Sequence, residues 1–172
     1  MPPIEKGPFI MRPFNSIRIL IGGAALGFGF LVYLMARPPE RTYFLFRTGM
    51  TNTLYHVLPR LFDPLSANLP AFLHVFAFTL ITGGILSSQK IGSLVVAVSW
   101  LITECAFEVG QKFPAWSEAL VPRWFDSLPV LENARSFFRT GTFDPLDLVA
   151  AAVGAVVAYV ALLATMERRV SL

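Results

Sequence analysis

The chain has 172 residues, of which 55% are hydrophobic and 15% are charged, and its mean hydropathy is +0.61. Soluble domains carry about 25% charged residues, so this chain has too few charges to cover a water-exposed surface. The shortage argues against a cytoplasmic enzyme, a nucleic-acid-binding protein and a disordered protein. The basic residues are scattered, without a run that would follow phosphates. The single cysteine, Cys105, excludes an internal disulfide.

Four stretches are nearly free of charge, and each predicts a helix of about 20 residues that crosses a membrane. The expected helices cover about residues 17–36, 67–87, 91–110 and 148–166. The first and fourth are apolar all round, which is unusual for a helix of a soluble protein. The predicted fold class is therefore all-α: a single membrane domain over residues 1–172, with two long aromatic-rich loops on the same face.

Lys6, Arg12 and Arg18 precede the first apolar stretch, a pattern that a signal peptide shares. The stretch is longer than the usual apolar core of a signal and ends in a poor cleavage site, so we expect an uncleaved helix. Four helices place both termini on one side of the membrane. Short segments on that side carry six basic and two acidic residues, which favours the cytoplasm, although Arg37 and Arg41 oppose it.

Two long segments, residues 38–65 and 112–143, join the predicted helices on the face opposite the termini. Both combine aromatic residues with proline, which suits segments that lie in the membrane interface and equally suits a docking surface. The expected partners are the lipid bilayer and, through these segments, other membrane protein subunits, but not nucleic acid. The sequence after Pro129 predicts a short helix that ends at Gly141.

Small residues recur on the first and fourth predicted helices, where they permit close contact between helices in lipid. We expect Gly154 in particular to serve helix packing. The small residues of the two helices are Gly22, Gly23, Gly27 and Gly29, and Ala151, Gly154, Ala155 and Ala158.

Ionisable residues in or beside membrane-spanning helices are costly, and each one therefore points to a site. Glu104, Glu108 and Gln111 follow the spacing i, i+4, i+7 and share one stripe of the third helix. His74 lies about two turns into the second helix. The directions of the helices bring all four residues toward the same membrane face.

The fourth helix begins with an acidic signal on that face. Asp144 suits the N-cap, Pro145 the first helical position and Asp147 the first turn. Arg135 and Arg139 precede this helix. The candidate polar site comprises His74, Glu104, Glu108, Gln111, Arg139, Asp144 and Asp147.

Three interpretations of this site stay open. The residues could form an ion-pair network that only holds the helices together. They could form a pocket for a polar or anionic headgroup, with Arg135 or Arg139 as anion contact. They could also form a catalytic site in which Glu104 or Glu108 is the general base. No compact metal or nucleophile motif is present, so we assign no metal, cofactor or catalytic residue.

The same residues resemble the VanZ-like family of small bacterial membrane proteins. The family pattern is a histidine in helix two, E-x-x-Q-x-F at the end of helix three, then an arginine and D-x-x-A-N-x-x-G at the start of helix four. His74, the run from Glu108 to Phe113, Arg139 and the run from Asp147 to Gly154 match it within residues 66–166.

This chain departs from the pattern in three ways. Ala151 stands where the family usually has asparagine, Arg139 lies two residues further from Asp147 than is common, and the segment between Phe113 and Arg139 is longer. The resemblance implies a cell-envelope protein with a role in low-level glycopeptide resistance, chiefly to teicoplanin, through a mechanism that is not established. It suggests a polar or lipid-linked ligand at one membrane face.

Two other functions fit the sequence. The chain could be a structural or assembly subunit of a larger membrane complex, with its aromatic segments as the docking surface. It could also be a membrane-embedded hydrolase or transferase.

Overall fold

The computed structural model describes residues 14–36, 67–86, 89–129 and 131–166, and every regular element among them is helical. The all-α prediction is confirmed, and the four expected helices are present with ends within three residues of the predicted ones. These long helices are α1 (Ser16–Ala36), α3 (Leu69–Ile85), α4 (Lys90–Lys112) and α7 (Pro145–Ala164).

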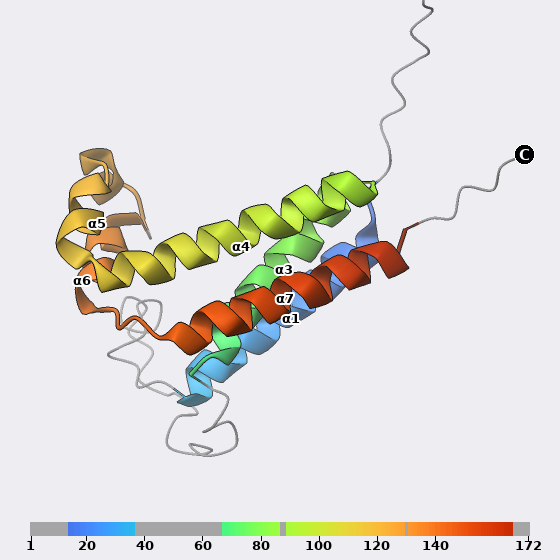
Figure 1. The fold of residues 1–172 in the computed structure, drawn as a ribbon, viewed down its shortest axis with the longest axis horizontal. Helices are drawn as coiled ribbons and strands as arrows, with labels where there is room; N and C mark the ends of the chain where they lie inside the picture. The colour runs from blue at the N-terminus through green and yellow to red at the C-terminus, as the bar shows by residue number, and fades with distance from the viewer. Residues whose placement is uncertain (1–13, 37–66, 87–88, 130, 167–172) are drawn as a thin grey trace, which may run out of the picture.

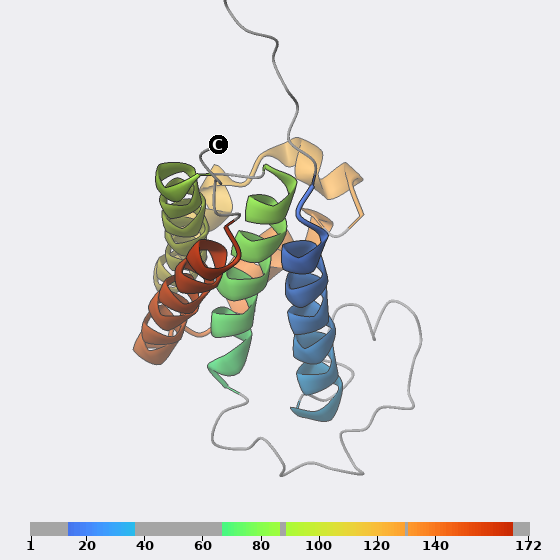
Figure 2. The ribbon, with the colours of Figure 1, turned by 90° about the vertical axis from the view of Figure 1, so that its right-hand side faces the viewer.

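The four long helices run alternately up and down and form a bundle (Figures 1 and 2). The helix α3 lies in the middle and packs against α1, α4 and α7, and α4 also packs against α7. One end of the bundle, here called the loop end, holds the last turns of α1 and α4 and the first turns of α3 and α7. The opposite end is the terminus end. As a result α3 and α7 lie side by side and parallel.

Three of the described helices, α1, α4 and α7, are long and apolar enough to cross a membrane. Their outward faces carry exposed apolar side chains such as Leu20, Ile102 and Val156, which suits contact with lipid. The helix α3 is apolar but has only 17 residues, about 26 Å at 1.5 Å per residue. It is shorter than the predicted helix over residues 67–87, since it begins two residues later and ends two residues earlier. The arrangement is that of a multi-pass membrane protein.

Small residues bring the helices together. A Cβ on Gly154 of α7 would lie 2.5 Å from the carbonyl oxygen of Phe72 in α3. A Cβ on Gly22 of α1 would lie 2.8 Å from the carbonyl oxygen of Ala77 in α3, whereas a Cβ on Gly23 or Gly27 would meet nothing within 4 Å. The small face predicted for the fourth helix therefore packs on α3, and that of the first helix does so only in part.

Arg18 lies inside the terminus end instead of flanking the bundle as a surface charge. Its side chain is 3% exposed. The guanidinium donates hydrogen bonds from Nη1 to the Gly83 carbonyl (3.1 Å), from Nη2 to the Leu162 carbonyl (2.9 Å) and from Nε to Oγ1 of Thr165 (2.8 Å). These carbonyls belong to the last turns of α3 and α7. One cation thus caps two helix C-termini, where the helix dipoles favour positive charge.

The segment 112–143 is mostly helical and packs at the end of α4 (Figure 1). The short helix predicted to end at Gly141 is α6, and its C-cap is Gly141. The Gln111 side chain lies so close to Gly141 that a Cβ there would overlap it. The predicted segment 38–65 lies outside the described residues. The elements of the described segment are α5 (Pro114–Leu120), η3 (Arg123–Ser127), η4 (Leu131–Asn133) and α6 (Ala134–Thr140).

Candidate functional site

The start of α7 forms one wall of the candidate site at the loop end. Asp144 is the N-cap, and its Oδ1 accepts a hydrogen bond from the Leu146 backbone N–H at 2.9 Å. Pro145 occupies the first helical position and Asp147 lies in the first turn, as the sequence predicts. Both carboxylates lie at the positive end of the α7 dipole, which stabilises their charge.

Asn68 joins this wall to α3, a role that the sequence did not indicate. Its Nδ2 donates hydrogen bonds to Oδ2 of Asp144 (3.1 Å) and to Oδ1 of Asp147 (2.8 Å). Asn68 is also the residue before α3, but its side chain makes no capping bond there. The amide is used between helices because two carboxylates face it and each carboxylate can accept several hydrogen bonds. The sequence signal for this role was an asparagine at the start of a helix, which predicts only an ordinary N-cap.

Glu108 of α4 is the most enclosed carboxylate of the site, with 8% of its surface exposed. Oε1 accepts a hydrogen bond from Nε2 of Gln111 at 3.2 Å. Oε2 is buried and makes no hydrogen bond of ordinary geometry to the described residues, although the Asp144 backbone N–H acts on the carboxyl group. The negative charges of Asp147 and Glu104 act on this carboxyl group. The group is therefore buried, incompletely hydrogen-bonded and close to two other carboxyl groups, which is costly in a fold that merely packs helices.

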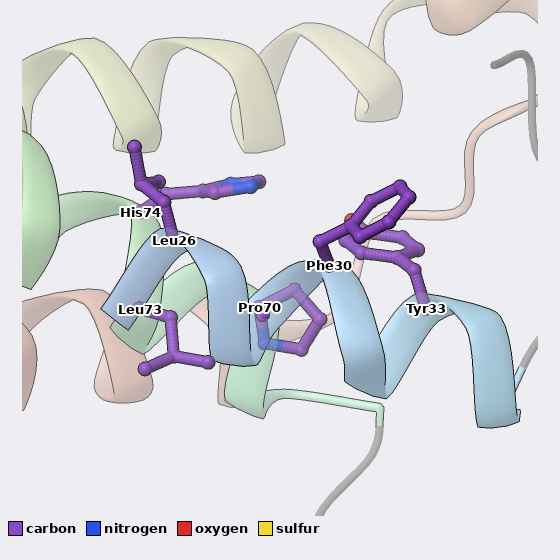
Figure 3. Close-up of a pocket in the computed structure, with 7 residues that line it drawn as sticks. Leu26, Phe30, Tyr33, Pro70, Leu73 and His74 are labelled. Carbon is purple, nitrogen blue, oxygen red and sulfur yellow. The ribbon is translucent and has the colours of Figure 1, made fainter. Parts of the chain in front are cut away.

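His74 and Glu104 form the deeper part of the site. Nδ1 of His74 lies 3.7 Å from Oε1 of Glu104, and their side chains are 39% and 19% exposed. The imidazole has ring contacts with Tyr33 of α1 and Phe78 of α3, at centroid distances of 6.5 and 6.2 Å. Figure 3 shows the imidazole and Tyr33 on one side of α1. From its place on α3, His74 therefore contacts Tyr33 of α1 and Glu104 of α4.

The structure does not bring the two arginines to these carboxylates. Nη1 of Arg135 bonds Oδ1 of Asp126 at 2.7 Å, and Nε of Arg139 bonds Oε1 of Glu118 at 3.1 Å. The hydrogen bond from Arg139 holds the pKa of the Glu118 carboxyl below its usual value. The expectation that Arg139 completes the polar site, and that either arginine contacts an anion there, is therefore not supported by the geometry.

The remaining side chains define what the site can do chemically. Carboxylates supply hydrogen-bond acceptors, and the amides of Asn68 and Gln111 already donate to them. Within the described ranges no group of three or more His, Cys, Asp or Glu side chains is arranged to hold a metal ion. The site therefore suits a ligand group that brings N–H or O–H donors.

The chain was also compared with known proteins. No protein-family model, no curated protein and no solved structure matches it. The VanZ-like family accordingly stays a prediction from the sequence.

Proposed function

We propose that this chain is a VanZ-like membrane protein of the bacterial cell envelope that binds the polar headgroup of a ligand at the loop end of its bundle. The arrangement of the motif residues supports this function. His74, Glu108, Gln111 and Asp147 come from three helices and lie at one end of the bundle. Arg139 is the motif residue that lies apart, since it pairs with Glu118.

The observation that carries the proposal is the buried Oε2 of Glu108, which makes no hydrogen bond of ordinary geometry to the residues that the structure describes. A buried polar atom without a partner costs about 1–3 kcal/mol, and more when it is charged. A ligand that donates a hydrogen bond to Oε2 removes this cost and gains a charge-assisted bond. Because Oε2 of Glu108 offers an acceptor, and Arg135 and Arg139 pair with Asp126 and Glu118 instead, the favoured headgroup is an amine or a hydroxyl, which supplies a donor.

Binding of two phospholipids to the purified full-length chain tests this function. Phosphatidylethanolamine carries an ammonium with N–H donors, whereas phosphatidylcholine carries the same charge without donors. We expect native mass spectrometry in a mild detergent to show about tenfold tighter binding of the ethanolamine lipid, as one charge-assisted hydrogen bond gives. Glu108→Gln should abolish this preference. Asp126→Asn, an exposed acid away from the site, is the control and should keep it.

The resistance-type role has its own cellular test. A teicoplanin-sensitive host that expresses the chain should need a higher inhibitory concentration than the same host with an empty vector. The Glu108→Gln variant should lose this gain while it accumulates to the same level in the membrane. An unchanged inhibitory concentration with the unaltered chain would count against this role, and an unchanged lipid preference in the variant would count against the headgroup site.

We propose a subunit of a larger membrane complex as the second candidate function. The surface of the 112–143 segment supports it, because Trp116 and Trp124 are 68% and 60% exposed and tryptophan is enriched at protein interfaces. Purification in a mild detergent should then recover stoichiometric partners that Trp116→Ala releases. A chain that purifies alone in several mild detergents would remove this candidate.

A further inference from the structure

A groove of about 160 Å³ lies between α1 and α3 near the loop end (Figure 3). Leu26 and Phe30 of α1 and Leu73 of α3 form apolar walls, and Gly29 leaves room between them. Tyr33 and His74 add polar atoms. An apolar cavity of about 150 Å³ stays dry and accepts a guest the size of benzene, so this groove has room for part of a hydrocarbon chain.

The groove reaches the lipid-facing surface of the bundle. Phe30 both lines the groove and is 50% exposed, and its neighbours Phe28 and Leu31 are 40% and 47% exposed. These residues belong to α1, one of the helices able to span a membrane. The groove is therefore continuous with a surface that hydrocarbon chains cover, and its walls have the same chemistry as those chains.

The polar side of the groove leads to the proposed headgroup site. His74 lines the groove, and its Nδ1 lies 3.7 Å from Oε1 of Glu104. Glu104 lies one turn before Glu108 on α4, and the charges of the two carboxyl groups act on each other. An apolar groove and a buried acceptor site thus meet through two side chains.

We propose that the groove holds the hydrocarbon chain of a lipid whose donor-bearing headgroup is bound at Glu108. This proposal rests on the proposed function, because it assigns the chain of the same ligand. A lipid enters the groove sideways from the bilayer, between α1 and α3. Its chain stays in an apolar environment, and only its headgroup moves out of the hydrocarbon region of the bilayer into the polar site. The ligand class is an amphiphile with an amine or hydroxyl headgroup.

Two glycines of α1 provide a matched pair of variants. A Cβ on Gly29 lies in ordinary contact with Leu73, 3.4 Å from its Cδ1, so Gly29→Leu starts without a Cβ clash and adds its side chain at the groove. A Cβ on Gly27 meets nothing within 4 Å, so Gly27→Leu adds the same side chain outside the groove. Leu26→Phe is a second way to fill the groove if Gly29→Leu does not fold.

The experiment uses the full chain in nanodiscs that contain phosphatidylethanolamine or phosphatidylcholine with a diazirine in one chain. After illumination, peptide mass spectrometry measures adducts on Leu73, which lines the groove and is 6% exposed, and on the lipid-facing residues Val153 and Val156 of α7. We expect the ethanolamine lipid to give about tenfold more groove adducts than the choline lipid. Adducts on α7 should be equal. Gly29→Leu should remove the excess and Gly27→Leu should keep it.

The outcomes separate the two proposals. If native mass spectrometry shows the preference for ethanolamine but groove adducts are equal for both lipids, the headgroup site stands and the groove proposal is overturned. The same holds if the excess survives in both Gly29→Leu and Leu26→Phe. If neither measurement distinguishes the two lipids, the headgroup site itself is wrong and the groove proposal fails with it.

Discussion

The buried arginine at the terminus end gives the sharpest test of how this bundle is held together. Arg18→Met keeps much of the apolar stem and removes the three hydrogen bonds to Gly83, Leu162 and Thr165. Hydrogen bonds from a charged group contribute about 1.5–3 kcal/mol each, and charge at a helix C-terminus adds about 0.3–1 kcal/mol per helix. Water can reach carbonyls in the last turns and replace part of this loss. We therefore expect a net cost of about 3 kcal/mol.

Titration with sodium dodecyl sulfate in mixed micelles, followed by circular dichroism, measures the free energy of unfolding. Arg18→Lys should lose less than Arg18→Met, since an ammonium keeps the charge but cannot reproduce the planar fork of donors. Arg123→Met, at an exposed position of η3, is the control and should change the free energy by less than about 0.5 kcal/mol. Equal effects of Arg18→Met and Arg123→Met would refute the capping role.

Three further predictions concern other contacts. Asn68→Asp replaces the donor between two carboxylates with a third carboxylate, so the free energy of unfolding should fall. This decrease should become smaller in acid, as carboxylates are protonated. Gly154→Ala should destabilise the bundle by about 1–3 kcal/mol because its Cβ meets α3 backbone at 2.5 Å, whereas Gly27→Ala should be neutral or stabilising in the same detergent titration. The pKa of Glu118 is lowered, so its pair with Arg139 contributes fully to stability above the usual glutamate pKa, and this contribution is lost as pH falls through the lowered value. Arg139→Gln should restore the usual pKa of Glu118 in a carboxyl NMR titration. An unchanged pKa in this variant would contradict the assigned cause.

The helices and the start of α7 could be predicted because local sequence decides them. Apolar length identified α1, α4 and α7, and Asp144 and Pro145 form a cap that depends only on neighbouring residues. The segment 112–143 has no long apolar period, so its fold, and with it the pairing of Arg139 with Glu118, depended on tertiary contacts.

The roles of Arg18 and Asn68 could not be predicted for a related reason. Each side chain binds groups more than 60 residues away in sequence, and spacing along one helix carries no information about such partners. Both roles follow from the parallel packing of α3 and α7. The dipoles of parallel neighbouring helices point the same way and repel each other. A cation at the shared C-terminal end and carboxylates at the shared N-terminal end offset this repulsion.

Glu108 shares this electrostatic reason only in part, through the Asp144 backbone N–H at the start of α7. It lies in the last turns of α4, near the negative end of that helix dipole, and beside Asp147. If Glu108 served only to hold the helices together, Glu108→Gln should destabilise the bundle at least as much as Asp147→Asn, which weakens a favourable dipole interaction and the bond from Asn68. We expect the opposite: a loss of about 1 kcal/mol for Asp147→Asn and no loss for Glu108→Gln in the detergent titration. A larger loss for Glu108→Gln would make Glu108 a structural residue and would remove the physical basis for placing a ligand beside it.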